Sequence, residues 1–169
     1  MGDYPVESVE TMARVAREIE RDETHFKPMI DMDMVSVNHE ITAQLARSAV
    51  RASTNLPIKY VVLDTKTGRT GRYLAAFRGR KTVMAVCYQL HAQRILALSY
   101  GVVPILRNQE LSDRYHFLVD ALEFLDQYRK LDDGDLMAIV GGSFGPDGGA
   151  SYVEIANVQN IRKRNEEIV

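Results

Sequence analysis

Four short apolar segments have the pattern of strands that are buried on both faces. They span residues 59–64, 82–87, 102–106 and 135–141, and they are rich in Val, Ile, Leu and Met with few polar interruptions. Runs of this length are typical of parallel strands that helices cover on both sides. A fifth segment, residues 152–158, alternates apolar and polar side chains, which indicates an edge strand with one exposed face.

Helical periodicity fills the gaps between these strands. Residues 69–78, 88–99 and 112–131 repeat apolar side chains at intervals of three and four. Alternating strands and helices predict right-handed βαβ units, and the short glycine-rich connection before the fifth strand requires an antiparallel hairpin. We therefore predict an α/β fold: a three-layer α/β/α sandwich with a five-stranded mixed sheet of order 3-2-1-4-5, whose last strand is antiparallel.

Two further helices are predicted ahead of the first strand. The first begins near Pro5, an irregular segment follows it, and Ser36 is a suitable N-cap for the second. The chain is accordingly divided into a helix and connecting segment at 1–35 and an α/β domain at 36–169. The charged tail at 162–167 is expected to fray.

Composition excludes several classes of protein. With 21 Lys and Arg against 23 Asp and Glu, the formal net charge of the 169 residues is -2, which gives no reason to expect nucleic acid or a membrane surface as a partner. No apolar run approaches the length of a membrane span. Because Cys87 is the single cysteine, an internal disulfide and a thiolate metal cluster are impossible, and a cytoplasmic location is expected.

The first candidate site is the loop that joins the first strand to the next helix. Hydroxyl groups, a glycine and a helix N-terminus form a typical anion site, and two basic side chains add positive charge. The alternative is an ordinary strand-to-helix turn with a threonine cap. The predicted phosphate-binding residues are Thr65, Lys66, Thr67, Gly68, Arg69 and Thr70.

The second candidate site is the loop at 141–149, which holds five of the eleven glycines. A hairpin that needs several positive φ angles and a loop whose backbone approaches a ligand explain this composition equally well. In the predicted sheet order, both loops flank the point where the strand order reverses, which is where doubly wound sheets bind ligands. The candidate ligand-loop residues are Gly142, Ser143, Phe144, Gly145, Gly148 and Gly149.

We predict no catalytic residue and no metal site in this chain. Asp31 and Asp33 lack a third ligand in a recognisable pattern, Ser143 lacks a nucleophile motif, and Cys87 ends a buried strand as an inert thiol. The histidines are scattered along the chain and are interpreted as surface or packing residues: His25, His39, His91 and His116.

The order of these motifs resembles the C-terminal domain of pyruvate kinase. The resemblance begins with the segment at 2–20, which is similar to the exit from that family's catalytic barrel. It continues through the loop at 65–70, the Tyr-Gly-Val-Val-Pro motif at 100–104 and the Asp-Gly-Asp motif at 133–135, and it covers nearly the whole chain. The resemblance implies the fold described above.

The same resemblance implies a function. The parent enzyme would transfer a phosphoryl group from phosphoenolpyruvate to ADP with Mg²⁺ and K⁺ in a barrel that this chain lacks, so the chain alone would be inactive and need no cofactor. In the family, the two loops hold an allosteric sugar phosphate, often fructose 1,6-bisphosphate. Here Asp147 and Glu154 would repel a second phosphate. The sequence is therefore equally compatible with an effector that has one phosphate group, a sugar monophosphate or a nucleotide monophosphate, and with no effector.

The implied partners are the catalytic barrel of the parent chain and further copies of the chain, because the family forms tetramers. Two alternatives remain open. One is a natural stand-alone module that binds a phosphorylated ligand. The other is a flavodoxin-like carrier of flavin mononucleotide, whose phosphate loop fits residues 65–70, although two helices precede that loop and no tryptophan is present to stack on a flavin.

Overall fold

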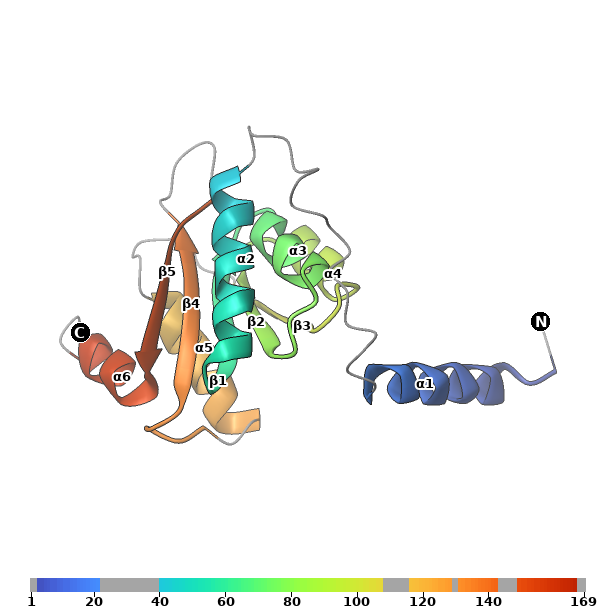
Figure 1. The fold of residues 1–169 in the computed structure, drawn as a ribbon. Coiled ribbons are helices and arrows are strands. Elements are labelled where there is room, and N and C mark those ends of the chain that lie inside the picture. The colour runs from blue at the N-terminus through green and yellow to red at the C-terminus, as the bar shows by residue number, and fades with distance from the viewer. Residues whose placement is uncertain (1–2, 22–39, 108–115, 129–130, 143–148, 167–169) are drawn as a thin grey trace.

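A computed structural model describes residues 3–21, 40–107, 116–128, 131–142 and 149–166 of the chain (Figure 1). After the first two helices, strands and helices alternate up to the last two strands, which follow one another directly, as the apolar pattern predicts. The described helices are α1 (Pro5–Arg21), α2 (Glu40–Asn55), α3 (Arg69–Ala76), α4 (Leu90–Leu96), α5 (His116–Tyr128) and α6 (Val158–Glu166). The strands are β1 (Ile58–Thr65), β2 (Thr82–Cys87), β3 (Val102–Leu106), β4 (Leu136–Gly142) and β5 (Ala150–Asn157).

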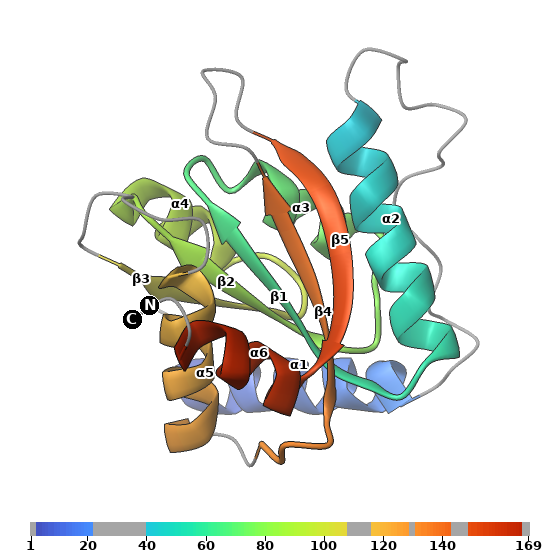
Figure 2. The ribbon, with the colours of Figure 1, turned by 90° about the vertical axis from the view of Figure 1, so that its left-hand side faces the viewer.

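The five strands form one mixed sheet of order β3-β2-β1-β4-β5, which confirms the predicted topology. The first four strands are parallel, and β5 returns antiparallel to β4. Figure 2 shows the strands fanned in this order by the twist of the sheet. The carboxyl ends of β1 and β4 are neighbours, because Leu63 pairs with Val140. The strand order therefore reverses between these two strands.

Each face of the sheet has its own apolar core. Strand residues alternate between the two faces, so Val61 and Leu63 belong to one core and Val62 to the other. Helices α2, α3 and α4 cover the first face, and α5 and α6 cover the second (Figure 2). The middle strands are buried from both sides, which is why their sequences read as continuous apolar runs.

The expectation that the C-terminal tail frays is wrong, because α6 covers most of it. Val158 and Ile161 lie on one side of α6 and are fully buried against the second face of the sheet. The Arg162 guanidinium also forms ion pairs with Asp126 at 2.7 Å and with Asp133 at 3.1 Å. Two buried side chains thus anchor a segment whose composition is mostly charged.

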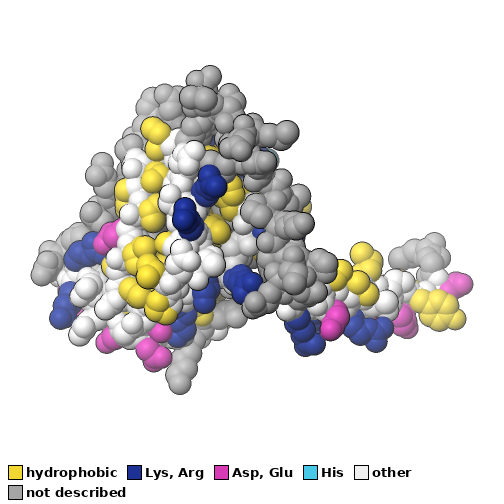
Figure 3. All heavy atoms as spheres, in the orientation of Figure 1, with side chains coloured by type: hydrophobic (Ala, Val, Ile, Leu, Met, Phe, Trp, Pro, Cys, Tyr) yellow, Lys and Arg dark blue, Asp and Glu magenta, His cyan; other side chains and the backbone are white. Residues whose placement is uncertain are grey.

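Helix α1 differs from the others because it buries none of its residues. Its apolar side chains lie along one side and its charged side chains along the opposite side (Figure 3). The exposed apolar residues are Tyr4, Val6, Val9, Met12, Val15 and Ile19, here called the α1 stripe. Among the described residues, no helix combines the length and the hydropathy that crossing a membrane requires.

Candidate anion-binding site

The Thr65–Thr70 loop is a tight turn that leads from β1 into α3. Gly68 occupies the N-cap position of α3 with φ 81° and ψ 0°, a left-handed conformation that favours glycine. The Gly68 N–H donates a hydrogen bond of 2.9 Å to the Thr65 side-chain oxygen. Thr65 thus fixes the turn, while its hydroxyl hydrogen remains available as a donor.

The first turn of α3 presents backbone donors at this loop. The first intrahelical hydrogen bond runs from the Arg72 N–H to the Gly68 carbonyl oxygen at 3.0 Å. The N–H groups of Arg69, Thr70 and Gly71 precede it, and Gly68 supplies no side-chain cap for them. Unpaired donors and the positive end of the helix dipole favour an anion at this position.

Side chains around the turn divide into a buried pair and an exposed group. Thr65 and Thr70 are only 6% and 5% exposed, so they hold the loop against the body of the domain. Lys66, Thr67 and Arg69 are exposed and supply two positive charges to the surface of the loop. This arrangement suits a small dianion such as a phosphate group, which takes several N–H donors and a nearby cation.

The second predicted loop is described only at its ends. Ser143, Phe144, Gly145 and Gly148 lie outside the described residues. A β-carbon on Gly142 would lie 2.0 Å from the Gly149 carbonyl oxygen, so the close approach of the two hairpin strands requires this glycine.

Gly149 meets a residue that sequence reasoning missed. A β-carbon on Gly149 would lie 2.3 Å from the side-chain oxygen of Thr42, near the start of α2. Thr42 is 7% exposed and is one of four buried polar residues among those described. The start of α2 therefore contacts the β4–β5 hairpin at the end of the sheet where β1 also ends (Figure 1). A polar side chain at a helix start was the only sequence signal for this contact.

A second missed feature is the carboxyl group of Asp64, the residue before Thr65. Burial raises the pKa of Asp64 to about 6, although its own backbone N–H and the Tyr88 hydroxyl favour the charged form and partly offset this effect. Burial also raises the pKa of Tyr88, and the nearby Asp64 charge adds to that shift. A lone acidic residue at the end of an apolar strand was the sequence signal for this group.

Of the remaining candidates, Cys87 and His91 lie among the described residues. Cys87 is fully buried, and burial raises its pKa to about 11, which favours the protonated thiol. His91 is exposed on α4. His25, His39, Asp31 and Asp33 lie outside the described residues. The described residues contain no group of three or more His, Cys, Asp or Glu side chains placed to hold a metal ion.

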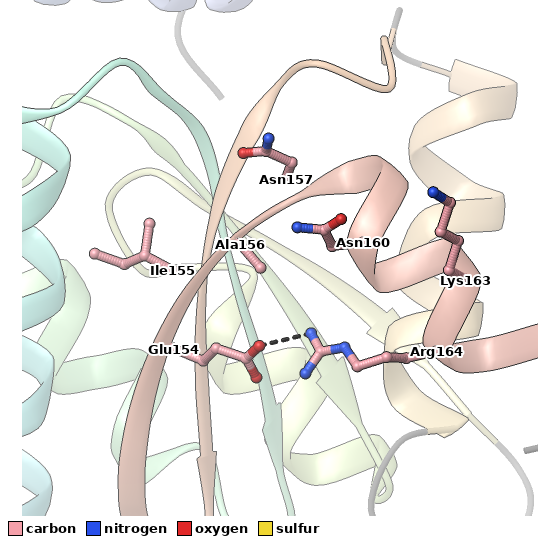
Figure 4. Close-up of a pocket in the computed structure, with 7 residues that line it drawn as sticks. All are labelled: Glu154, Ile155, Ala156, Asn157, Asn160, Lys163 and Arg164. Atoms are coloured by element: carbon pink, nitrogen blue, oxygen red, sulfur yellow. Dashed lines mark ion pairs between the residues drawn. The ribbon is translucent and has the colours of Figure 1, made fainter. Parts of the chain in front are cut away.

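A separate pocket of about 530 Å³ lies between β5 and α6 (Figure 4). Glu154 on β5 and Arg164 on α6 point toward one another across it and form an ion pair of 2.6 Å. The other lining residues are Ile155, Ala156, Asn157, Asn160 and Lys163. This pocket includes none of the predicted site residues.

Comparison with known proteins finds sequence similarity over most of the chain. The family model described as "Pyruvate kinase, alpha/beta domain" matches residues 43–156. Similar proteins include the pyruvate kinase of Borreliella burgdorferi, 28% identical over 168 residues, which cover 97% of this chain and 35% of that protein. The pyruvate kinase of Methylorubrum extorquens is 31% identical over 160 residues, covering 93% of this chain and 33% of that protein. The chain thus spans about a third of the length of these relatives.

Proposed function

Because the chain belongs to the pyruvate kinase alpha/beta domain family, we propose that it is the C-terminal regulatory and assembly domain of a pyruvate kinase. In this proposal the parent enzyme transfers a phosphoryl group from phosphoenolpyruvate to ADP. The catalytic barrel, with its divalent metal and potassium ions, corresponds to the part of the relatives that this chain does not cover. The chain alone forms no pyruvate in a coupled assay, and measurable pyruvate formation would contradict the proposal.

We further propose that the Thr65–Thr70 loop binds the phosphate group of an allosteric effector. The observation that carries this proposal is the uncapped first turn of α3, which lies beside Lys66 and Arg69 where the strand order reverses. The proposed ligand is a sugar monophosphate or a nucleotide monophosphate, and the charge of Glu154 does not set this choice, because Glu154 forms an ion pair with Arg164 on α6.

Calorimetric titration of the purified chain tests effector binding. The ligands are fructose 1,6-bisphosphate, glucose 6-phosphate, ribose 5-phosphate and AMP. We expect at least one to bind and to raise the thermal stability, by about 2.7 kcal/mol at a hundredfold excess over Kd. The absence of heat and of a thermal shift with all four ligands would contradict effector binding.

A pair of matched variants locates the site. The double substitution Lys66→Gln and Arg69→Gln removes two exposed charges from the loop, and we expect it to weaken binding at least tenfold. Arg47→Gln with Arg51→Gln removes the same charge from the exposed side of α2 and serves as the control. Equal weakening by both pairs would indicate a general charge effect rather than a site at the loop.

The α1 stripe is the proposed contact with the catalytic barrel. Its six apolar side chains are 54–71% exposed, and a continuous apolar patch of this kind marks an interaction surface. In a chain joined to its barrel, Met12→Gln should lower the midpoint of thermal unfolding of the barrel. The control Glu10→Gln changes a charged residue of the same helix. If both variants unfold like the parent, the stripe does not contact the barrel.

A further inference from the structure

A group of ionisable side chains lies at the carboxyl ends of three strands, on the opposite face of the sheet from the Thr65–Thr70 loop. Asp64 is the penultimate residue of β1, and its side chain lies on the α5 side because Val62 belongs to that core. Tyr88 follows β2 and belongs to the same core. Arg107 follows β3, and Asp120 lies on α5.

Among the described residues, no cation forms an ion pair with Asp64. The Arg107 guanidinium forms an ion pair of 2.7 Å with Asp120, so these two charges offset one another. The Tyr88 hydroxyl oxygen is fully buried and interacts with Asp64, but it makes no hydrogen bond of regular geometry with any described residue. Within the described part of the chain, an ionised Asp64 is therefore poorly compensated.

The neighbouring strand on the other side contributes no charge to Asp64. In the pairing of β1 with β4, Leu63 lies opposite Val140, so Asp64 lies beside Gly141. The ring of Tyr152 on β5 covers Gly141, since a β-carbon there would lie 2.3 Å from the Tyr152 hydroxyl oxygen. Asp64 thus directly precedes the Thr65–Thr70 loop and lies beside the last residues of β4.

We propose that the protonation of Asp64 controls the affinity of the Thr65–Thr70 loop for anions: the neutral carboxyl group permits tight binding, and the carboxylate weakens it. The inference rests on the proposed function, because it concerns the regulation of the same anion site. Its consequence is an effector response that becomes weaker as the pH rises through the range in which Asp64 ionises.

The physical reason is repulsion between the Asp64 carboxylate and the bound anion in a partly buried environment. Asp64 directly precedes Thr65, whose side-chain oxygen holds the Gly68 N–H at the start of the turn, so its carboxylate and an anion at the turn lie in the same part of the domain. Partial burial of Asp64 reduces the screening of this repulsion by salt. By linkage, a bound anion must make Asp64 harder to ionise by the same factor. We expect a factor of about five to ten, at the lower end of typical couplings between sites.

Titration with sulfate at constant ionic strength tests the inference. Sulfate is the probe because, unlike phosphate, it remains a dianion throughout the range from about pH 5 to about pH 8, so its own charge does not change. For the unaltered chain, we expect the Kd of sulfate to rise about five- to tenfold between these two pH values. Asp64→Asn should keep the tight binding at both pH values.

The control variant is Asp126→Asn, which removes a carboxylate from the exposed side of α5 and should retain the full pH dependence. An unchanged pH dependence in Asp64→Asn would overturn the inference and assign the effect to another group. Binding that does not vary with pH in the unaltered chain would overturn only the inference. No sulfate binding at either pH in any variant would overturn the proposed anion site, and the inference with it.

Discussion

The half-buried carboxyl group of Asp64 leads to a quantitative prediction about stability. Burial moves the pKa of this group from 3.8 to about 6, a shift of roughly two units, and each unit corresponds to about 1.36 kcal/mol. Ionised Asp64 therefore destabilises the folded chain by at most about 3 kcal/mol. Asp64→Asn supplies a neutral side chain of the same shape and removes this cost.

The sign and the pH range follow from proton linkage. Between pH 3.8 and about pH 6, the folded state binds more protons at Asp64 than the unfolded state does, so stability falls as the pH rises. The full cost is present above about pH 6 and absent below pH 3.8. The advantage of Asp64→Asn over the unaltered chain should grow by about 2 kcal/mol between about pH 4.5 and about pH 8.

Urea denaturation of three proteins at these two pH values measures the effect. They are the unaltered chain, Asp64→Asn and the control Asp126→Asn. The control should change the unfolding free energy by well below the Asp64 effect, because exposed ion pairs contribute ~0.2–1 kcal/mol. If Asp64→Asn is less stable than the unaltered chain at about pH 8, or if its advantage does not change with pH, the account of this group is wrong.

Two further predictions concern packing. Gly71→Ala should destabilise the chain by about 1 kcal/mol, because its β-carbon would lie 2.8 Å from a methyl carbon of Leu96. In a Leu96→Ala background, the same substitution should instead stabilise α3 by roughly 0.5–1 kcal/mol through helix propensity, and a double-mutant cycle by thermal unfolding checks the change of sign. Ile161→Ala should lower the unfolding free energy by ~2–5 kcal/mol. Arg162→Ala should lower the unfolding free energy by no more than ~1 kcal/mol, because its ion pairs are exposed. Equal losses of stability in Ile161→Ala and Arg162→Ala would show that charge rather than burial anchors α6.

The sheet was predictable from sequence because its strands are buried on both faces. Such strands leave long apolar runs, and the short connection before β5 admits only a hairpin, so order and direction follow from a few topological rules. Helix α6 was not predictable in this way. Its attachment depends on two apolar residues, Val158 and Ile161, within a charged segment.

The site was only partly predictable. The Thr65–Thr70 turn follows from its glycine and its place between a strand and a helix. The roles of Asp64 and Thr42 depend on neighbours that are distant in sequence, namely Tyr88 for Asp64 and Gly149 for Thr42. Periodicity reports which face a side chain occupies, but it does not report the partner that the fold brings to that side chain.

The central claim is that the first turn of α3 binds an anion, and backbone amide resonances test it most directly. We predict that a sulfate titration, followed by nuclear magnetic resonance, shifts the amide signals of Gly68, Arg69, Thr70 and Gly71 together in a saturable manner. Shifts that are confined to the pocket around Lys163 and Arg164, or no saturable shift anywhere in the chain, would contradict the claim.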